Sequence, residues 1–544
     1  MGLLMLLGGQ SVIQFWVDPV SGSNSNNGSQ SAPFATIYHA TYQSLVNKWT
    51  ANTNLVVNVV PSGPLQSTDH IRLVPQHNNG SILVRSATAS PFVVNDACDR
   101  FITGLDNAKA TLRVENCDVT CNRVVFLFTS TGSYNITLAG NCTFTHARVF
   151  NEEGIRINAP ASGTLRIQSG CTITGWNLWA NLVVGSITNI DIDGAVISST
   201  AAIGGTTVLS GASVKLQNSQ ITIDNNTVVN QLRIIASNST SPIEIRNNTI
   251  TYTNSSGYAM FIYSPSPGTS TTASLVMSGN TTSGWIGVGQ EITEASTRAV
   301  NNAKGINFTS IAITDNDMTQ PVLSAGVFSL FANTDGAVVT DNYFRVAQLG
   351  DTTNVHQVYL WGDGIQFENN LCQASVLAFG PNPNIEGNTI VADRCILLGG
   401  TQGGSTASGG GNNYTVRDNV LISFDDDCYS DYAFNGAYPT NLGTLVADID
   451  ANYYVTLSGA AGLARLTAAG LTATTMTQLR NLWQQSVLSG SGSGVWGDAS
   501  NSDNDLTSSH VTAGAGYDSA VSLCVQSAEL SRSQLASLDT ALRA

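Results

Sequence analysis

The chain has 544 residues and a formal net charge of −15, yet only 11% of its residues are charged and 42% are apolar. An apolar fraction of this size can form a buried core, which excludes wholesale disorder. A duplex nucleic-acid binder needs clustered cations, and this sequence has no basic run, so we expect neither nucleic acid nor an anionic membrane as a partner. Neutral or weakly charged ligands fit better, and glycans are the clearest class of this kind.

The N-terminal residues 1–15 begin with the apolar run MGLLMLLGG. This run has no basic n-region and no small-residue cleavage site, so it does not match a signal peptide, and it is too short to span a bilayer. We expect residues 1–15 to form an attachment segment, without membrane insertion. An additional packed strand is the alternative.

Nine cysteines are scattered along the chain. Their odd number and irregular spacing do not indicate a disulfide framework. The Cys/Cys and Cys/His spacings of zinc sites are also missing, so we expect no metal of this kind and no cofactor.

Residues 16–40, WVDPVSGSNSNNGSQSAPFATIYHA, join a Gly/Asn/Ser-rich loop to Pro-Phe and a short apolar stripe. This pattern predicts a short capping helix, with Ser31 as its expected N-cap. The segment NLVVNVVPSGP, residues 54–64, then predicts the first strand of a regular array. We therefore expect residues 16–110 to form an N-terminal cap and the first rungs of that array.

One pattern recurs within residues 111–456: an apolar alternation, a polar corner, a small or amide residue, and a second apolar alternation. In the copy IEIRNNTITYT, Asn248 is in phase with Ile250 and Tyr252 and therefore points inward. The corresponding positions are Cys117, Cys142, Cys171, Ala195, Ser219, Asn248, Asn280, Asn316, Asn342, Asn370, Asn388, Asn419 and Asn452. Steps of 18 to 36 residues, with short strands rich in Val, Ile and Thr, predict a parallel β-helix.

The inward amide at each corner has a structural explanation. Successive rungs of a β-helix are stacked at the strand spacing of about 4.8 Å, so inward asparagines can hydrogen-bond above and below and form a ladder. We attribute their place at the bend to the tolerance of asparagine for left-handed backbone geometry. Cys117, Cys142 and Cys171 should stack at the same corner as buried thiols.

This asparagine ladder resembles that of the pectate-lyase-like superfamily, and residues 16–40 resemble the N-terminal motif of many such proteins. The resemblance covers about residues 15–456 and implies an all-β, right-handed parallel β-helix with an N-terminal capping helix. The superfamily includes lyases, hydrolases, adhesins and phage tailspikes, so the fold alone does not select an activity. Tailspikes and other β-helix virion proteins are the members that this sequence resembles most.

Residues 457–544 depart from the repeat and predict a mixed helical and linker region. Helical spacing is seen in Met476, Leu479, Leu482 and Trp483, and again in Leu530, Leu535, Leu538 and Leu542. A flexible SGSGSG run lies between the two segments. Two interpretations of the last helix stay open: a packed C-terminal cap, and an element for oligomerisation or attachment.

The most concentrated acidic segment is SFDDDCYSDYAF. Counting from the ladder asparagines places Asp425 one rung, about 5 Å, from Arg394. Carboxylates about 5 Å apart would suit a retaining glycosidase, and about 6.5–9.5 Å an inverting one. We therefore select Asp425, Asp427 and Arg394 as candidate catalytic residues. An exposed acidic loop, one that holds Ca²⁺ or pairs with Arg394, is the alternative.

Aromatic and acidic side chains elsewhere are candidates for substrate binding, because sugar rings stack on aromatic side chains. We select Trp361 in VYLWGDG, Trp285 with the nearby Glu291, and Tyr429 beside the aspartates. The alternatives are tryptophans that only cover the core and a solvated turn around Glu291.

The hypothesis is a polysaccharide-recognising β-helix that serves as a phage tailspike or virion fibre component for host-surface attachment, with glycan depolymerase activity left open. Its expected partners are a host-surface polysaccharide and other virion proteins, its expected assembly is a homotrimer, and its expected location is the virion tail. The trimer is implied by the resemblance to tailspikes. A secreted monomeric polysaccharide lyase or glycoside hydrolase and a non-catalytic structural or adhesive β-helix are the alternatives.

Overall fold

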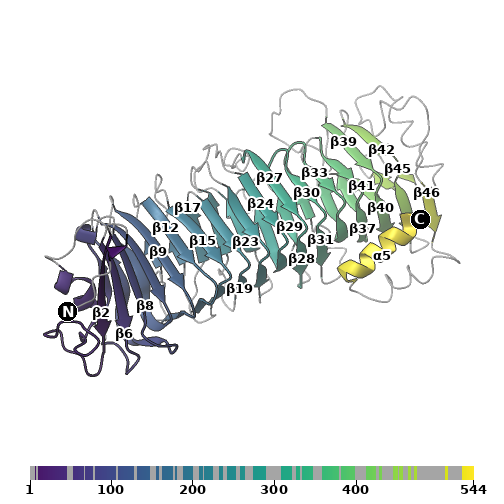
Figure 1. Cartoon of the computed structure of the whole chain (residues 1–544). Coiled ribbons are helices and arrows are strands. Elements are labelled where there is room, and N and C mark those ends of the chain that lie inside the picture. Colours follow the sequence, from purple (N-terminus) through teal and green to yellow (C-terminus); the bar gives the residue numbers. More distant parts are fainter. Residues whose placement is uncertain are drawn as a thin grey trace. The chain divides into compact units, whose positions relative to one another are not determined.

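The computed structural model divides the chain into two compact units, Met1–Asn254 (unit 1) and Ser255–Ala544 (unit 2), each a stack of parallel strands (Figure 1). The residues that it describes are 6–7, 10–45, 53–66, 68–77, 80–105, 108–127, 132–146, 155–157, 162–174, 178–180, 188–199, 207–211, 213–223, 232–236, 242–252, 258–263, 274–289, 308–321, 326–330, 334–346, 358–378, 382–398, 412–423, 428–431, 445–450, 452–456, 464–466, 471–473, 509–512 and 530–543.

Each unit winds through three faces in a repeated order. A strand of face 1 ends at a tight corner, the chain continues through face 2, and a second corner leads to face 3, from which a loop returns to face 1. Strands on one face pair in parallel with those of the rungs before and after. The predicted right-handed parallel β-helix is therefore confirmed.

In unit 1, face 1 contains β2 (Gln10–Val17), β3 (Thr53–Val59), β5 (Gly80–Ser86), β7 (Lys109–Glu115), β9 (Ser133–Ala139), β12 (Ser162–Ile167), β15 (Thr188–Asp193), β18 (Ser213–Gln217) and β21 (Ile243–Arg246). Face 2 contains β10 (Thr143–His146), β13 (Thr172–Thr174), β16 (Val196–Ser199), β19 (Gln220–Ile223) and β22 (Thr249–Tyr252). Face 3 contains β4 (Ile71–Leu73), β11 (Ile155–Ile157), β14 (Leu178–Ala180), β17 (Thr207–Gly211) and β20 (Leu232–Ala236). The long strands β6 (Phe92–Gly104) and β8 (Cys117–Leu127) run through faces 2 and 3, and β1 (Leu6–Leu7) pairs antiparallel with β2.

In unit 2, face 1 contains β24 (Ser274–Ser278), β27 (Ser310–Thr314), β30 (Val338–Thr340), β33 (Gln366–Glu368), β36 (Asn384–Glu386), β39 (Asn412–Arg417) and β42 (Leu445–Asp450). Face 2 contains β25 (Thr281–Ser283), β28 (Asp317–Gln320), β31 (Tyr343–Val346), β34 (Leu371–Gln373), β37 (Thr389–Ala392), β40 (Val420–Ser423), β43 (Tyr453–Thr456) and β46 (Ser509–Thr512). Face 3 contains β23 (Tyr258–Tyr263), β26 (Trp285–Val288), β29 (Phe328–Leu330), β32 (Val358–Leu360), β35 (Val376–Ala378), β38 (Ile396–Leu398), β41 (Tyr429–Asp431) and β44 (Ala464–Leu466). The last of these pairs antiparallel with β45 (Leu471–Ala473).

At each of the predicted positions from Cys117 to Asn452, the inward residue of the corner between faces 1 and 2 is buried. The left-handed conformation, however, belongs to the residue before it: φ is 54° at Asn247, 53° at Asp315 and 59° at Asp341. Short polar side chains tolerate this region of backbone space. One residue therefore makes the bend, and the next points into the core.

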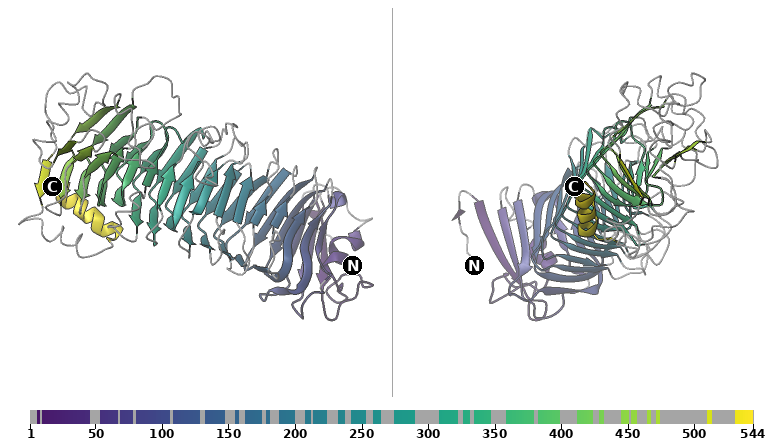
Figure 2. Two further views of the ribbon diagram at one scale, coloured as in Figure 1. Left: turned by 180° about the vertical axis from the view of Figure 1, so that it is seen from behind. Right: turned by 90° about the vertical axis from the view of Figure 1, so that its right-hand side faces the viewer.

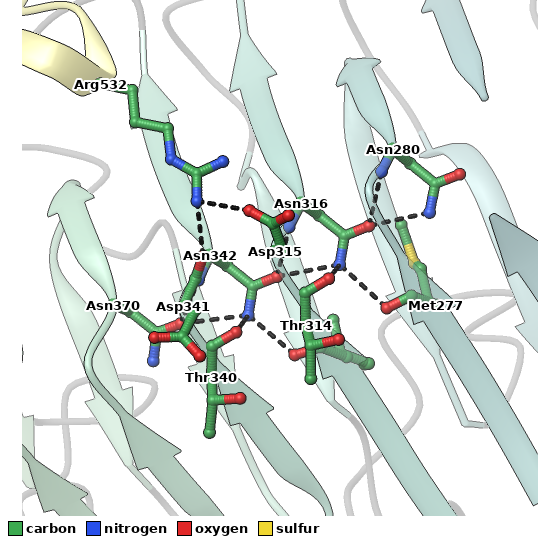
Figure 3. Close-up of polar contacts among 11 residues, drawn as sticks. Met277, Asn280, Thr314, Asp315, Asn316, Thr340, Asp341, Asn342, Asn370 and Arg532 are labelled. Atoms are coloured by element: carbon green, nitrogen blue, oxygen red, sulfur yellow. Dashed lines mark hydrogen bonds and ion pairs between the residues drawn. The ribbon is translucent and has the colours of Figure 1, made fainter. Parts of the chain in front are cut away.

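The asparagines of unit 2 form the predicted ladder (Figure 3). Asn316 Nδ2 donates to Asn342 Oδ1 at 2.9 Å, and Asn342 Nδ2 donates to Asn370 Oδ1 at 3.1 Å. Asn342 Nδ2 also lies 2.8 Å from the carbonyl oxygen of Ile313 and 2.9 Å from that of Thr340. Each amide thus satisfies backbone groups that would otherwise be buried without partners.

The predicted N-terminal capping helix is α1 (Ile37–Thr41), followed by the short 3-10 helix η1 (Gln43–Leu45); a second, η2 (Pro75–His77), follows β4. The N-cap of α1 is Thr36 rather than the predicted Ser31, and Thr36 Oγ1 accepts a hydrogen bond from the backbone N–H of His39. The Asp69 carboxylate accepts two more, from the backbone N–H groups of Ile37 and Tyr38, both at 2.8 Å. Burial raises the pKa of Asp69 to about 6.

The C-terminal helix α5 (Arg532–Arg543) lies on the outside of face 2 of unit 2 (Figures 1 and 2). The predicted apolar stripe is buried there against outward-pointing side chains of the strands. The stripe is Leu530, Leu535, Leu538 and Leu542, and its partners include Tyr343, Val391, Val420, Ile422 and Val455. The helix is thus a packed element of its own chain. The helix expected around Met476 lies outside the described residues.

Candidate functional site

The predicted acidic site falls at the corner between β40 and β41. Asp425, Asp427 and Glu291 lie outside the described residues. Arg394 is half-buried in the turn between β37 and β38, and Tyr429 is the first residue of β41, where its backbone pairs with Ile396.

The strand pairing on the two sides of this corner gives two different offsets between the rungs of Arg394 and Asp425. Thr389 pairs with Val420, an offset of 31 residues, whereas Ile396 pairs with Tyr429, an offset of 33. The corner that contains the aspartates is therefore two residues longer than the corner that contains Arg394. Counting along the chain does not decide which of residues 425–427 faces the arginine, so this triad stays a prediction.

Two of the predicted substrate-binding residues, Trp285 and Trp361, are brought to the same outer face. Trp285 begins β26, and its indole ring stacks on the ring of Tyr359 in β32, with centroids 6.2 Å apart and planes inclined by 20°. Tyr359 points outward, because its neighbours Val358 and Leu360 point into the core. Both rings are half-buried.

The orientation of Trp285 is set by two residues of the intervening rung. Its indole N–H donates to Ser329 Oγ at 2.8 Å. Gly326 lies against the indole, where an added Cβ would be 2.9 Å from the nearest ring atom, Cε2 of Trp285. A glycine is needed for this close approach, so the ring is held before any ligand arrives.

Trp361 extends the same aromatic surface. It directly follows β32, and together with Tyr359 it packs against Leu377 and Leu397, which are fully buried although their register places them on the outward side. We call Trp285, Ser329, Tyr359 and Trp361 the aromatic platform. Flat, half-exposed rings of this kind suit the apolar face of a sugar ring.

A pair of glutamates lies on the neighbouring face 1. Glu368 pairs with Glu386 across β33 and β36, so their side chains project outward from adjacent rungs. Asn384 Nδ2 donates to both, at 2.8 Å to Glu368 Oε1 and 3.3 Å to Glu386 Oε2. Arg417 follows Glu386 in the same column. The pair is thus bridged by a neutral amide and flanked by one cation.

Tyr359, Glu368 and Glu386 are not among the residues predicted from the sequence. A signal for the glutamates was present, since each stands two positions before a ladder asparagine in QFENN and NIEGN. In unit 2 the residues at that position pair across successive strands of face 1 and form one column. Tyr359 had no such signal, because the second corner has no recurring residue from which to count.

Within the described ranges, no three or more His, Cys, Asp or Glu residues are grouped so that they could hold a metal ion. Nor does any helix in the described part of the chain combine the length and apolar character needed to cross a membrane.

No family model and no curated protein matches the chain. It is similar to a tailspike protein double mutant of E. coli bacteriophage HK620, with 14% identity, a TM-score of 0.38, and 83% of this chain and 78% of that chain covered. A GH136 lacto-N-biosidase from Eubacterium ramulus gives 10% identity, a TM-score of 0.31, and coverage of 83% and 67%. A tailspike mutant of the same phage in complex with a pentasaccharide gives 10%, 0.30, 83% and 78%. The assignment as a parallel β-helix rests on the strand pairing of the chain itself.

Proposed function

We propose that the protein binds polysaccharide through the aromatic platform of unit 2. The observation that carries this proposal is the stacked pair Trp285 and Tyr359, held by Ser329 and Gly326 on an outward face. The indole N–H of Trp285 is already bonded, so the part of its ring that stays exposed beside Tyr359 offers a ligand an apolar surface. The low charge content of the chain also favours an uncharged or weakly charged ligand.

Binding is tested with the full chain on a panel of bacterial capsular and O-antigen polysaccharides, followed by titration of the best ligand. Trp285→Ala should weaken binding about tenfold, which corresponds to about 1.4 kcal/mol. Gly326→Ala should act in the same direction, because the new methyl group displaces the indole. Trp16→Ala removes a half-buried tryptophan from β2 in unit 1 and should leave affinity unchanged. Equal affinity of the Trp285 and Trp16 variants would contradict the proposal.

Cleavage of the bound glycan is a second candidate function, favoured by Glu368 and Glu386. Side chains in register on adjacent strands start about 4.8 Å apart, which suits the roughly 5–5.5 Å separation of the carboxyl groups in retaining glycosidases. The candidate site of Asp425, Asp427 and Arg394 is the alternative location for this activity.

The two locations are separated by assaying release of reducing ends from the same polysaccharides. If face 1 is the site, Glu368→Gln and Glu386→Gln should each abolish release, whereas Asp425→Asn and Asp427→Asn should not. Glu244→Gln is a matched control, because this outward glutamate of unit 1 is paired with Lys215 at 3.3 Å. Loss of activity only in the aspartate variants would move the site to the β40–β41 corner.

We further propose that the biological setting is a phage tailspike or virion fibre that attaches to a host-surface polysaccharide as a homotrimer. The support is the resemblance of the ladder and of residues 16–40 to the superfamily that includes tailspikes, together with an apolar run near the N-terminus and a C-terminal region that departs from the repeat. Sedimentation equilibrium should give three times the chain mass of 57.0 kDa. A monomer would favour the secreted lyase or hydrolase instead.

A further inference from the structure

Three cysteine side chains are stacked inside unit 1, at the corner between faces 1 and 2. Cys117 begins β8, and Cys142 and Cys171 come directly before β10 and β13, so the strand register places all three at the same position on consecutive rungs. Cys117 Sγ lies 3.2 Å from Cys142 Sγ. All three are free thiols and are at most 1% exposed. We call these three residues the thiol stack.

The packing of this corner does not require sulfur. On the next two rungs the same position is filled by Ala195 and Ser219, and both are buried. A small side chain of either kind is therefore sufficient to fill the space. Thiols on consecutive rungs differ from these residues in one chemical respect, because two neighbouring thiols can be joined by a covalent bond. The proposed function does not use this property.

The spacing of the rungs matches the geometry of a disulfide bond. Neighbouring strands lie about 4.8 Å apart, and the Cα atoms of disulfide-bonded cysteines are about 4.4–6.8 Å apart. Closing a bond between Cys117 and Cys142 would shorten their sulfur–sulfur distance from 3.2 Å to about 2.05 Å. Cys117 and Cys171 are two rungs, about 9.6 Å, apart, which is too far for a bond. Every bond within the thiol stack therefore includes Cys142.

Cys142 is also the thiol that is best placed to react first. Hydrogen bonds from Cys117 and Cys171 lower the pKa of Cys142, whereas burial raises the pKa of Cys117. The thiolate is the nucleophilic form of cysteine. Cys142 directly follows Gly140 and Asn141, which are both exposed, so a local opening of this corner would admit a molecule close to water in size.

We propose that the thiol stack is a modification site for hydrogen peroxide, at which oxidation joins Cys117 to Cys142 by a disulfide bond. The Cys142 thiolate attacks one peroxide oxygen, and the O–O bond breaks. The sulfur becomes a sulfenic acid, and the displaced hydroxide takes the thiol proton and leaves as water. Cys117 then attacks this sulfur, the S–O bond breaks, and a second water leaves with the Cys117 proton. Two thiols and one peroxide thus give one disulfide and two waters, and Cys171 stays a thiol.

The folded full chain is treated with hydrogen peroxide, its remaining thiols are alkylated, and linked tryptic peptides are identified by tandem mass spectrometry. Fragment ions distinguish Cys117 from Cys121, which lies on the same tryptic peptide. The native chain should contain the link between Cys117 and Cys142, and dithiothreitol should remove it. Cys171→Ala and Cys142→Ala are matched variants, because each removes one buried thiol from the stack. The first should keep the link, and the second should not join Cys117 to Cys171.

Thermal unfolding provides a second measurement. The bond closes a loop of 25 residues (142 − 117), so oxidation should raise the unfolding midpoint of the native chain by about 5 °C. The same treatment should not raise the midpoint of Cys142→Ala. Circular dichroism before oxidation shows whether each variant is folded.

Three outcomes would overturn the proposal. They are no link between Cys117 and Cys142 in the folded native chain, the same yield of this link from the chain unfolded in urea, and an oxidised native chain with an unchanged midpoint. All three are measured on the native chain and do not depend on the folding of a variant. The thiol stack lies in unit 1, so its oxidation can be shown or refuted whether or not the aromatic platform of unit 2 binds polysaccharide.

Discussion

The two units build the same corner with different side chains. In unit 1 the inward position is mostly filled by thiols and small residues, and Cys117 Sγ lies 3.2 Å from Cys142 Sγ. In unit 2 it is an asparagine on every described rung, and each amide bonds to the next. The preceding left-handed residue is common to both units. The bend is therefore made by that residue, and the amide is an added tie between rungs.

Face 2 differs between the units as well. Its outward residues in unit 1 include exposed or half-exposed threonines such as Thr174, Thr249 and Thr251. In unit 2 the outward residues near α5 are apolar, and the leucines of the helix cover them. A strand pattern that is apolar on both sides thus marks the place where a further element is packed.

The largest difference in stability between the two kinds of corner is expected on substitution of Asn342. Asn342→Ala would leave the carbonyl of Ile313 and the amide of Asn316 without these partners in the core, and each unsatisfied group costs about 1–3 kcal/mol. We expect unit 2 to lose about 4 kcal/mol of unfolding free energy. Cys142→Ala at the equivalent corner of unit 1 should cost about 1 kcal/mol. Denaturant unfolding followed by circular dichroism measures both, and similar losses would show that the ladder adds nothing to the bend.

The apolar outer face of unit 2 is tested at Leu535, which is fully buried. Leu535→Ala should destabilise the docked helix by about 3 kcal/mol through lost burial and the cavity that remains. Thr540→Ala, on the exposed side of the same helix, should change stability by less than about 0.5 kcal/mol. Hydrogen exchange of the α5 amides reports the opening of this helix. Equal protection in the two variants would contradict the conclusion that the leucine stripe holds α5 on face 2.

Unit 1 has a buried carboxyl group in its cap, Asp69, that should make its stability depend on pH. The pKa of Asp69 is raised to about 6 in the folded chain, above its ordinary value of 3.8. The folded state therefore binds an extra proton between these values, so stability rises as pH falls from above 6 towards 4, by about 2–3 kcal/mol. Asp69→Asn should flatten this rise in unfolding experiments between pH 7 and pH 4.

Asp18, in the same unit, is a control because its pKa is shifted in the opposite direction. Although desolvation alone would raise its pKa, hydrogen bonds from Ser21 and Ser62 lower the pKa to about 2. The stabilisation from Asp18 is therefore complete above about pH 4 and is lost as pH falls further. Asp18→Asn should leave the rise between pH 7 and pH 4 intact, and a rise that persists in Asp69→Asn would assign it to another group.

The fold and the ladder could be predicted from the sequence because each depends on local alternation that repeats. The phase of Ile250 and Tyr252 was enough to turn Asn248 inward. The bend itself was assigned one residue too late, because Asn247 and Asn248 are identical in sequence and only the backbone conformation separates them.

The candidate site was less predictable for a physical reason. The stacking of Trp285 on Tyr359 joins residues on different rungs, and the loops between those rungs vary in length. The sequence predicted a binding role for both tryptophans, but it did not predict that they lie on one face. The glutamate pair depends on register across β33 and β36, which the ladder does determine, so it could have been found by counting back from Asn370 and Asn388.

The smallest expected difference in stability comes from one surface ion pair in each unit. Arg532 Nη2 lies 2.7 Å from Asp315 and 2.8 Å from the carbonyl oxygen of Asp341, at the start of α5. Lys215 and Glu244 in unit 1 are both on strands, at 3.3 Å. Exposed pairs contribute about 0.2–1 kcal/mol, and we expect Arg532→Ala to lie at the upper end because it also loses the carbonyl contact.

A double-mutant cycle of Arg532→Ala with Asp315→Asn isolates the charge term, since asparagine tolerates the left-handed backbone at position 315. The coupling energy should be about 0.5 kcal/mol and should decrease at high salt. The corresponding cycle of Lys215→Ala with Glu244→Gln should give no more than this. A coupling well above 1 kcal/mol at Arg532 would mean that the ion pair, rather than the leucine stripe, holds the helix on face 2.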